Sequence, residues 1–154
     1  MLTKEEKKEL NTTFWRGFKN FSKRYKSCSG KRINWINYPS DVTDIYIRLH
    51  ADTSQAMMTF DIQCRDSGVR SVFWEQMLEL RSVMEKNMPI KPIWIEQLNL
   101  PDGLIISRIE WHQKNLNYMN LEDHSAFYQF FMSILLPFDL FYQEFKDILV
   151  SLAD

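Results

Sequence analysis

Several residue types that define familiar protein classes are scarce in this chain of 154 residues. The 2 cysteines, Cys28 and Cys64, are too few for a disulfide framework or, without help from histidine, for a structural zinc site. With only 4 glycines and 5 prolines, the chain is neither collagen-like nor of low complexity. The longest apolar run, from Ile134 to Phe138, falls far short of the roughly 18 residues that a membrane span requires. We therefore expect a globular protein that makes no contact with a membrane.

What the chain does contain is typical of one folded domain. Hydrophobic residues make up 45% of it and charged residues 25%, which are ordinary values for globular proteins. The length suits a single domain over residues 1–154, large enough to bury a substantial core. The first eight residues are charged where a signal peptide would be apolar, so we expect a cytoplasmic protein with reduced thiols.

The net charge of −1 conceals an uneven distribution along the chain. Residues 1–32 carry ten Lys or Arg and three Glu, whereas the remainder of the chain is net negative. A basic segment on an acidic body indicates either a phosphate-bearing partner or self-association between unlike patches. The alternative is a solvated helix face that has no binding role.

The basic segment has the pattern of an amphipathic helix from about Thr3 to Lys26. Thr3 and Glu6 have the spacing of a capping box, in which each side chain accepts a hydrogen bond from the other residue's amide. Apolar side chains recur on one face, and Trp15 lies at its border. The opposite face carries the candidate contacts to a nucleic-acid backbone: Arg16, Lys19, Lys23 and Lys26.

Two pairs of segments have the pattern of antiparallel hairpins. Residues 42–50 and 55–65 alternate apolar and polar side chains on either side of a turn at Asp52. Residues 91–98 and 104–113 read as two further strands, joined through the tight turn Pro101-Asp102-Gly103.

Two more helices complete the expected architecture. Asp66 is a candidate N-cap for a helix over residues 67–87, with Val69, Val72 and Phe73 on its core side and Trp74 and Leu78 off it. The last helix, over residues 120–152, is the most apolar element, and Pro137 is expected to kink or break it. The sequence therefore predicts an α+β fold of order α-β-β-α-β-β-α, with a mainly antiparallel four-stranded sheet and a long C-terminal helix kinked at Pro137.

The strand pattern gathers polar side chains on one face of the predicted sheet. A half-solvated antiparallel sheet has such a face without any function, and cross-strand pairs such as Arg48–Asp61 would then be structural. In the functional interpretation, two arginines on this face bind a carboxylate or phosphate in a bidentate manner. The candidate residues are Tyr46, Arg48, Asp61, Arg108, Glu110 and His112, accompanied by His50 and Gln63 and, depending on register, by Glu96.

No motif in the sequence indicates a reaction. His50, His112, Asp61 and Glu110 lack the spacing of a dedicated metal site, and we expect neither a metal nor a cofactor. A restriction-type nuclease needs an acidic residue followed by Asp/Glu-x-Lys on the next strand, and the nearest segments here lack the lysine. Cys28 has Lys26 and Lys31 nearby, which would lower the pKa of a reactive thiol, although a loop cysteine is more often incidental.

Residues 29–38 have the sequence Ser-Gly-Lys-Arg-Ile-Asn-Trp-Ile-Asn-Tyr, and residues 44–48 have the sequence Asp-Ile-Tyr-Ile-Arg. These two stretches resemble a bacterial family of uncharacterised domains, DUF4268. Phe14-Trp15, Ser107-Arg108-Ile109 and the aromatic residues 138–142 also fit, so the resemblance covers nearly the whole chain. It implies no catalytic residue, but it implies a link to DNA processing or defence, because the domain often follows nuclease-like regions in that family. The resemblance also implies that six positions are important for folding or for binding: Gly30, Trp35, Asn37, Tyr38, Arg48 and Arg108.

Three hypotheses about function follow. The first is a non-enzymatic interaction module that self-associates into a homo-oligomer or binds a protein partner. It is suggested by the apolar last helix, by Trp74 and Leu78, which lie off the core side of their helix, and by the opposite charges of the two regions of the chain. The second is a nucleic-acid accessory domain that binds phosphate through the basic helix. The third is a degenerate nuclease-like enzyme that uses the polar sheet face, which would require a deep pocket there.

Overall fold

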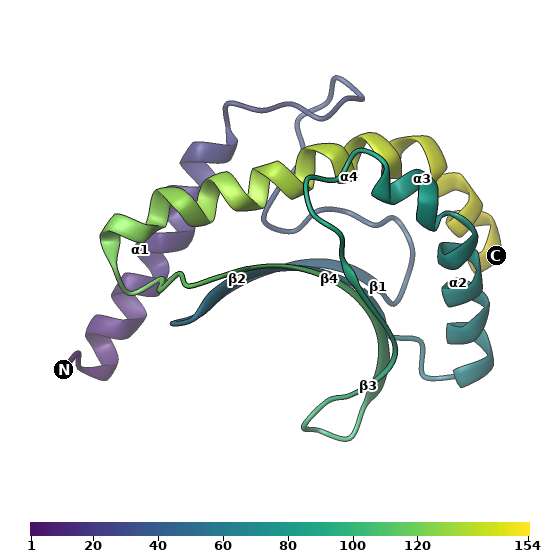
Figure 1. Ribbon diagram of the computed structural model, residues 1–154, viewed down its shortest axis with the longest axis horizontal. Coiled ribbons are helices and arrows are strands. Elements are labelled where there is room, and N and C mark those ends of the chain that lie inside the picture. The colour runs from purple at the N-terminus through teal and green to yellow at the C-terminus, as the bar shows by residue number, and fades with distance from the viewer.

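Four antiparallel strands form one sheet in the order β1-β2-β4-β3, as the computed structural model of residues 1–154 shows (Figure 1). The strands are β1 (Ile45–Ala51), β2 (Gln55–Ile62), β3 (Ile93–Asn99) and β4 (Ile105–Lys114). They form two hairpins, and β2 of the first pairs with β4 of the second. The predicted α+β architecture with a four-stranded antiparallel sheet is therefore confirmed.

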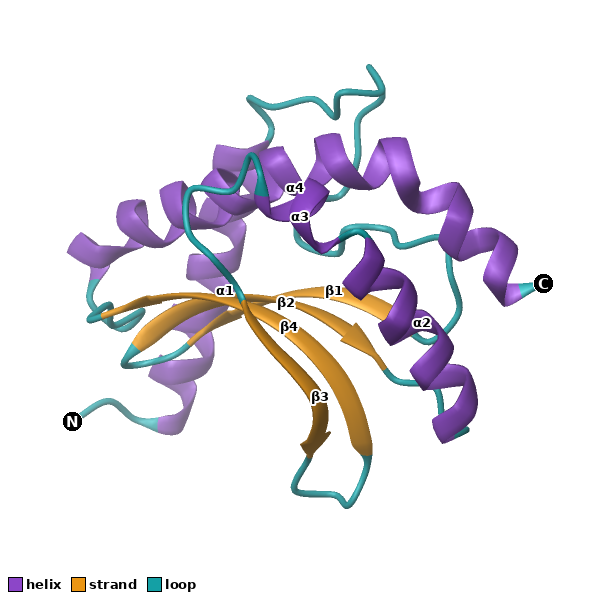
Figure 2. Cartoon of the chain, turned by 45° about the vertical axis from the view of Figure 1, so that its right-hand side comes forward, coloured by secondary structure: helices purple, strands orange, loops and turns teal.

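The helices all lie on one side of this sheet. They are α1 (Lys4–Ser22), α2 (Ser67–Glu79), α3 (Arg81–Glu85) and α4 (His124–Ala153), and a 3-10 turn over Leu121–Asp123 precedes α4. The sheet curls, and α4 arches over its convex face while no helix covers its concave face (Figures 1 and 2). None of these helices combines the length and apolar character needed to cross a membrane.

Aromatic side chains fill the space between the sheet and α4. Phe60 of β2 and Trp111 of β4 contact Phe138 of α4, at ring-centroid distances of 6.0 and 6.3 Å. Phe138 in turn stacks on Tyr142 at 5.3 Å. All four side chains are fully buried, so this layer is the centre of the hydrophobic core. The apolar character of α4 is accounted for by its central position.

Helix α1 begins as predicted and ends earlier than predicted. Thr3 and Glu6 form the capping box in both directions. The helix ends at Ser22 and not near Lys26, because the following residues turn away to begin a long loop that crosses α4. Its close approach to α4 depends on Gly17, where a Cβ atom would lie only 2.3 Å from the hydroxyl of Tyr128.

The predicted helix over residues 67–87 is two helices, α2 and α3, which meet at Leu80. Asp66 caps α2 through the amides of Gly68 and Val69, as expected. The core side was predicted only in part: Phe73 is buried as expected, but Val69 and Val72 are exposed, and Trp74, which was placed off the core side, is buried. Trp74 packs edge-on against Trp94 of β3 at a ring-centroid distance of 5.5 Å. A strand of the same chain therefore covers the side of α2 on which Trp74 lies.

Helix α4 continues without a break through Pro137. Of the two outcomes predicted at this proline, a break does not occur, and the helix stays long and arches over the sheet (Figure 1). The aromatic side chains of Phe131 and Phe138 on either side of the proline are both fully buried.

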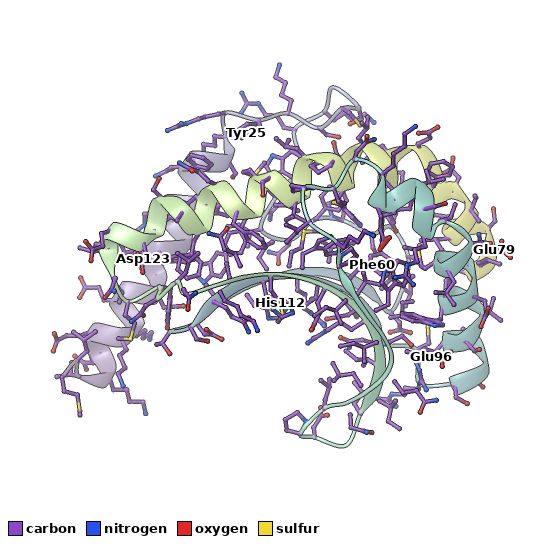
Figure 3. The ribbon with its side chains drawn as sticks, in the orientation of Figure 1. Tyr25, Phe60, Glu79, Glu96, His112 and Asp123 are labelled. Atoms are coloured by element: carbon purple, nitrogen blue, oxygen red, sulfur yellow. The ribbon has the colours of Figure 1, made fainter.

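A bulge interrupts the pairing of β3 with β4. Ile95 lies opposite Arg108 and Leu98 opposite Ile106, so Glu96 and Gln97 together face the single residue Ser107. Glu96 therefore does not join the polar side chains of the concave face. In Figure 3 it lies in the space between the second hairpin and α2.

Candidate functional site

The polar side chains predicted for one sheet face lie on the concave, uncovered side. Figure 3 shows His112 on this side and Phe60 on the opposite side, among the helices. The register places Tyr46 opposite Asp61 in the first pair of strands and Asp61 opposite Arg108 in the second. Strand alternation thus brings Arg48, Asp61 and Arg108 to the same surface.

Asp61 is the centre of this surface. Its carboxylate is completely buried beneath two guanidinium groups, with Arg48 Nη1 at 2.8 Å from Oδ2 and Arg108 Nε at 2.7 Å from Oδ1. Arg108 Nη2 also donates to Oδ2 at 3.1 Å, which makes that pair bidentate. Arg48 in addition donates to Gln63 Oε1 and lies over the ring of Tyr46.

The histidines extend the network on both sides of Asp61. His50 Nε2 lies 3.0 Å from the hydroxyl of Thr59, which donates to Asp61 at 3.2 Å. Burial, followed by the positive charge of Arg108, lowers the pKa of His50 below its ordinary value of 6.5. On the other side, His112 Nε2 lies 2.8 Å from Glu110 Oε1, and Nδ1 contacts Gln55.

The concave face is largely neutralised by its own ion pairs. Arg108 binds Asp61 through both Nε and Nη2, whereas Arg48 binds Asp61 and Gln63 through Nη1, so Asp61 engages all of one guanidinium edge and part of the other. The structure gathers no group of three or more His, Cys, Asp or Glu side chains that could hold a metal ion. Tyr46 and Arg48 line an open hollow of about 600 Å³, and the role of Tyr46, Glu110 and His112 as binding residues stays a prediction.

The second candidate surface is the basic one, formed by α1 and the loop that follows it. No Asp or Glu occurs between Glu9 and Asp41, whereas seven Lys or Arg do. All seven are exposed, and none lies within 4.0 Å of a carboxylate. We call this the basic surface; it comprises Arg16, Lys19, Lys23, Arg24, Lys26, Lys31 and Arg32.

A groove crosses the basic surface where the end of α1 meets the following loop. It has a volume of about 330 Å³ and is lined by Lys19, Lys23 and Arg32 together with Tyr25 and Trp35. Trp35 is buried, and its Nε1 donates to the carbonyl oxygen of Tyr25 at 3.2 Å. The half-buried ring of Tyr25 is accordingly the more accessible of the two aromatic side chains.

The residues singled out by the family resemblance contribute mainly to the loop over residues 23–44. Gly30 adopts φ = 82°, a left-handed conformation that glycine adopts without strain. Trp35 and Tyr38 are buried beneath the loop, whereas Asn37 is exposed. Gly30, Trp35 and Tyr38 thus have structural roles, and nothing in their surroundings assigns a binding role to Asn37.

The loop is fixed by Asp139, a buried carboxylate in the middle of α4. It accepts hydrogen bonds from the hydroxyl of Tyr38 at 2.6 Å, the amide of Cys28 at 2.8 Å and the hydroxyl of Ser27 at 3.0 Å. Burial and the adjacent carboxylate raise the pKa of Tyr38. The pKa of the Cys28 thiol is also raised, by burial and by the charge of Asp139, so the reactive thiolate considered from the sequence is disfavoured.

Sequence reasoning missed Asp139, although a signal for it exists. A lone aspartate inside the most apolar stretch of the chain, between Phe138 and Leu140, requires buried hydrogen-bond donors. Those donors come from residues more than 100 positions away in the sequence, so their identity could not be read from α4 itself.

Comparison with known proteins identifies one family. The family model described as "Domain of unknown function (DUF4268)" matches residues 10–146, which include the helices α2 and α3, all four strands and most of α1 and α4. Neither the curated proteins nor the solved structures gave a match.

Proposed function

The chain belongs to the DUF4268 family, which has no assigned function, and from this premise we propose that it is a non-enzymatic module that binds a nucleic acid. The observation that carries the proposal is the basic surface. Its seven cationic side chains are exposed and free of carboxylate partners, on a protein whose net charge is −1. A cluster of unpaired cations on a nearly neutral protein favours a polyanionic partner.

The geometry favours contacts to the phosphate backbone over contacts to bases. Arg16, Lys19 and Lys23 project from one side of α1, and Arg32 reaches the same groove from the loop. Trp15, the aromatic residue at the border of this side, is stacked on Phe131 at a ring-centroid distance of 5.8 Å and is not free to stack on a base. Binding is therefore expected to depend strongly on salt and weakly on sequence.

The anchoring of the loop supports the same proposal. Asp139 fixes the segment between Ser27 and Tyr38, so Lys31 and Arg32 are held at one position relative to α1. A preorganised set of cations loses less conformational freedom on binding than a flexible tail of the same charge.

The test is a fluorescence-anisotropy titration of a labelled 20-base-pair DNA duplex across a salt series, and of single-stranded DNA in a second arm. We expect binding at low salt with a slope of log K against log salt of about −3 to −5, since roughly four to six phosphates would be neutralised. The variant Lys19→Gln/Lys23→Gln should bind at least tenfold more weakly at low salt and have a shallower slope. A matched control, Lys86→Gln/Lys91→Gln, removes two exposed lysines from elsewhere on the protein and should bind as the wild type does.

Two outcomes would overturn the proposal. One is an absence of binding to either form of DNA at low salt. The other is an equal loss of affinity in the two double variants, because it would mean that only overall charge matters.

Self-association is a second candidate, supported by the end of the molecule formed by α2 and α4. There Val72 and Leu152 are 50% and 38% exposed, beside the carboxylates of Glu75 and Glu79. This patch is complementary in charge to the basic surface, so a second copy of the chain would dock head to tail. Sedimentation velocity at low salt should then show oligomers that Glu75→Lys/Glu79→Lys dissociates, and a strict monomer at several hundred micromolar would exclude the idea.

A further inference from the structure

Arg70, in the first turn of α2, is a buried guanidinium without an ionic partner. Only 7% of the residue is exposed, and its side chain runs back along the helix so that Nη1 donates to the carbonyl oxygen of Cys64 at 3.2 Å. No carboxylate lies within 4.0 Å of it, in contrast to Arg48 and Arg108. Arginine remains charged at every accessible pH and has five N–H donors, so one carbonyl leaves most of its binding capacity unused. Buried arginines are almost always paired with an anion.

The surroundings of Arg70 form a polar pocket. It has a volume of about 360 Å³ and no hydrophobic lining, and it lies between the start of α2 and the bulge of the second hairpin. The hydroxyl of Ser107 is occupied by the carbonyl oxygen of Glu96, whereas those of Ser67 and Ser71 are exposed and make no hydrogen bond within the protein. The pocket residues are Ser67, Gly68, Arg70, Ser71, Glu96, Gln97 and Ser107.

The bulge determines which strand residues reach this pocket. Because Glu96 and Gln97 together oppose the single residue Ser107, the extra residue bends β3 next to α2. Figure 3 shows the labelled Glu96 in this position. Without the bulge, strand alternation would carry the following residues of β3 to the other face of the sheet.

The other charged groups near Arg70 do not neutralise it. Arg65 lines a second opening that also includes Ser67 and Arg70, and it adds positive charge there. Asp44 and Asp102 also line that opening, but neither forms an ion pair with Arg70 within 4.0 Å, and Asp66 is engaged in capping α2. Glu96 faces Arg70 across the pocket beyond ion-pair distance, with its side chain exposed.

We propose that this pocket binds the oxyanion, phosphate or carboxylate, of a small polar ligand. Arg70 supplies a buried guanidinium group, and Arg65 adds a second positive charge at the rim. Ser67 and Ser71 supply hydroxyl groups that donate hydrogen bonds. Glu96 is placed to accept a hydrogen bond from a hydroxyl group of the same ligand. The volume of about 360 Å³ is within the range of small-molecule sites. This site is separate from the basic surface, which lies on α1 and the loop after it.

The first test uses inorganic phosphate, with acetate in a second arm and chloride to keep the ionic strength constant. A ligand that binds only the folded state raises the melting temperature with a saturable dependence on concentration. We expect such a rise for at least one of the two anions, and the more effective one identifies the chemistry of the bound group. No difference from chloride in either arm would overturn the proposal.

The second test uses variants on the rim of the pocket, which leave the buried Arg70 intact and the fold undisturbed. Arg65→Gln should weaken the binding of the effective anion about three- to fivefold, in line with one exposed charge pair. Ser67→Ala/Ser71→Ala should weaken it about fivefold, as expected for the loss of two hydroxyl contacts. The control Lys86→Gln removes a positive charge of α3's C-cap without touching the pocket and should leave the affinity unchanged.

Glu96→Gln decides between a ligand and an internal partner for Arg70. If the pocket receives an external anion, this variant binds phosphate or acetate more tightly, because a repelling carboxylate is gone, and the protein keeps its stability. If the variant melts at a markedly lower temperature and gains no affinity, Glu96 is the partner of Arg70 in solution and the proposal is wrong.

Discussion

Two buried aspartates, Asp61 in β2 and Asp139 in α4, are stabilised in opposite ways. Asp61 is 0% exposed and is paired with two arginines on the open face of the sheet. Asp139 is 2% exposed, lies under the loop over residues 23–44 and is held by neutral donors from Ser27, Cys28 and Tyr38. The first arrangement pairs one carboxylate with two cations, whereas the second surrounds a carboxylate with uncharged hydrogen-bond donors.

This difference separates the two candidate surfaces. Around Asp61 the cations are occupied, so the concave face has little electrostatic attraction for an external anion. Around Asp139 the carboxylate holds the loop without using any of the nearby lysines or arginines, so those cations stay available on the basic surface. The proposed nucleic-acid contact depends on this availability.

The largest effect is expected for Asp61→Asn. Removing the charge leaves two guanidinium groups side by side, and breaking a buried ion pair from one side typically lowers the free energy of unfolding by about 3–5 kcal/mol. Urea denaturation followed by tryptophan fluorescence measures the change. Arg48→Gln is the comparison, and it should be milder because the side chain of Arg48 is 37% exposed. Equal effects of the two variants would contradict the central role of Asp61.

Asp139→Asn should lower the free energy of unfolding by about 2–3 kcal/mol, as expected when hydrogen bonds to a buried charged group are replaced. The new amide would direct a donor at the hydroxyl of Tyr38 or the amide of Cys28, which now donate to the carboxylate. Hydrogen exchange of the Cys28 amide should accelerate more than that of amides in β2. Leu140→Ala, a substitution at an exposed neighbour on the same helix, is the control. Unchanged exchange at Cys28 would show that Asp139 does not hold the loop.

Gly17→Ala tests the contact that positions α1, and with it the basic surface. Alanine is the better helix former by about 1 kcal/mol, but a Cβ atom 2.3 Å from the hydroxyl of Tyr128 must displace that group from its hydrogen bond to Phe14. Overpacking costs about 1–3 kcal/mol, so we expect a net destabilisation of about 1 kcal/mol in thermal or urea unfolding. In the background of Tyr128→Phe, which lacks the hydroxyl, the penalty should shrink. A stabilising effect of Gly17→Ala alone would show that the helices can move apart freely.

The smallest effect concerns pH and the network around Asp61. His50 faces Thr59, Asp61, Arg48, Arg108 and Glu110, and its pKa in the folded protein is lowered from 6.5 by burial and by Arg108. The unfolded chain therefore binds more protons than the folded protein in the window just below pH 6.5. Stability should fall as the pH decreases through this window and be retained above it. His50→Gln should reduce that dependence when the free energy of unfolding is measured from pH 7.5 to 5.5, and an unchanged slope would assign it to other groups.

Much of the fold was predictable because it rests on local patterns. Period-two alternation located β1 and β2, and the turn Pro101-Asp102-Gly103 marked the connection between β3 and β4. The capping residues Thr3 and Asp66 located the starts of α1 and α2. Strand alternation also predicted that Arg48 and Arg108 would share a surface, because parity along a strand decides the face of each side chain.

The errors concern features that depend on packing. The core side of α2 was predicted to include Val69 and Val72 as well as Phe73, but only Phe73 is buried, because the helix also buries the large Trp74 against Trp94 of the sheet. Helix α4 was expected to kink or break at Pro137, and it does not break there, because residues on both sides of the proline are buried in the core. Glu96 was left dependent on register, and the pairing of Ile95 with Arg108 decided its side, because Glu96 then alternates to the opposite face of the sheet.

The amino-acid sequence by itself determined the architecture, the charge asymmetry and the presence of a polar sheet face, because these follow from composition and short-range periodicity. Only the tertiary structure decided which charges are neutralised. The arginines of the sheet meet Asp61 across strands, Asp139 meets a loop more than 100 residues away, and Arg70 is buried with no anion. Burial and long-range pairing set the electrostatic character of each surface, and neither is encoded in any single segment of the chain.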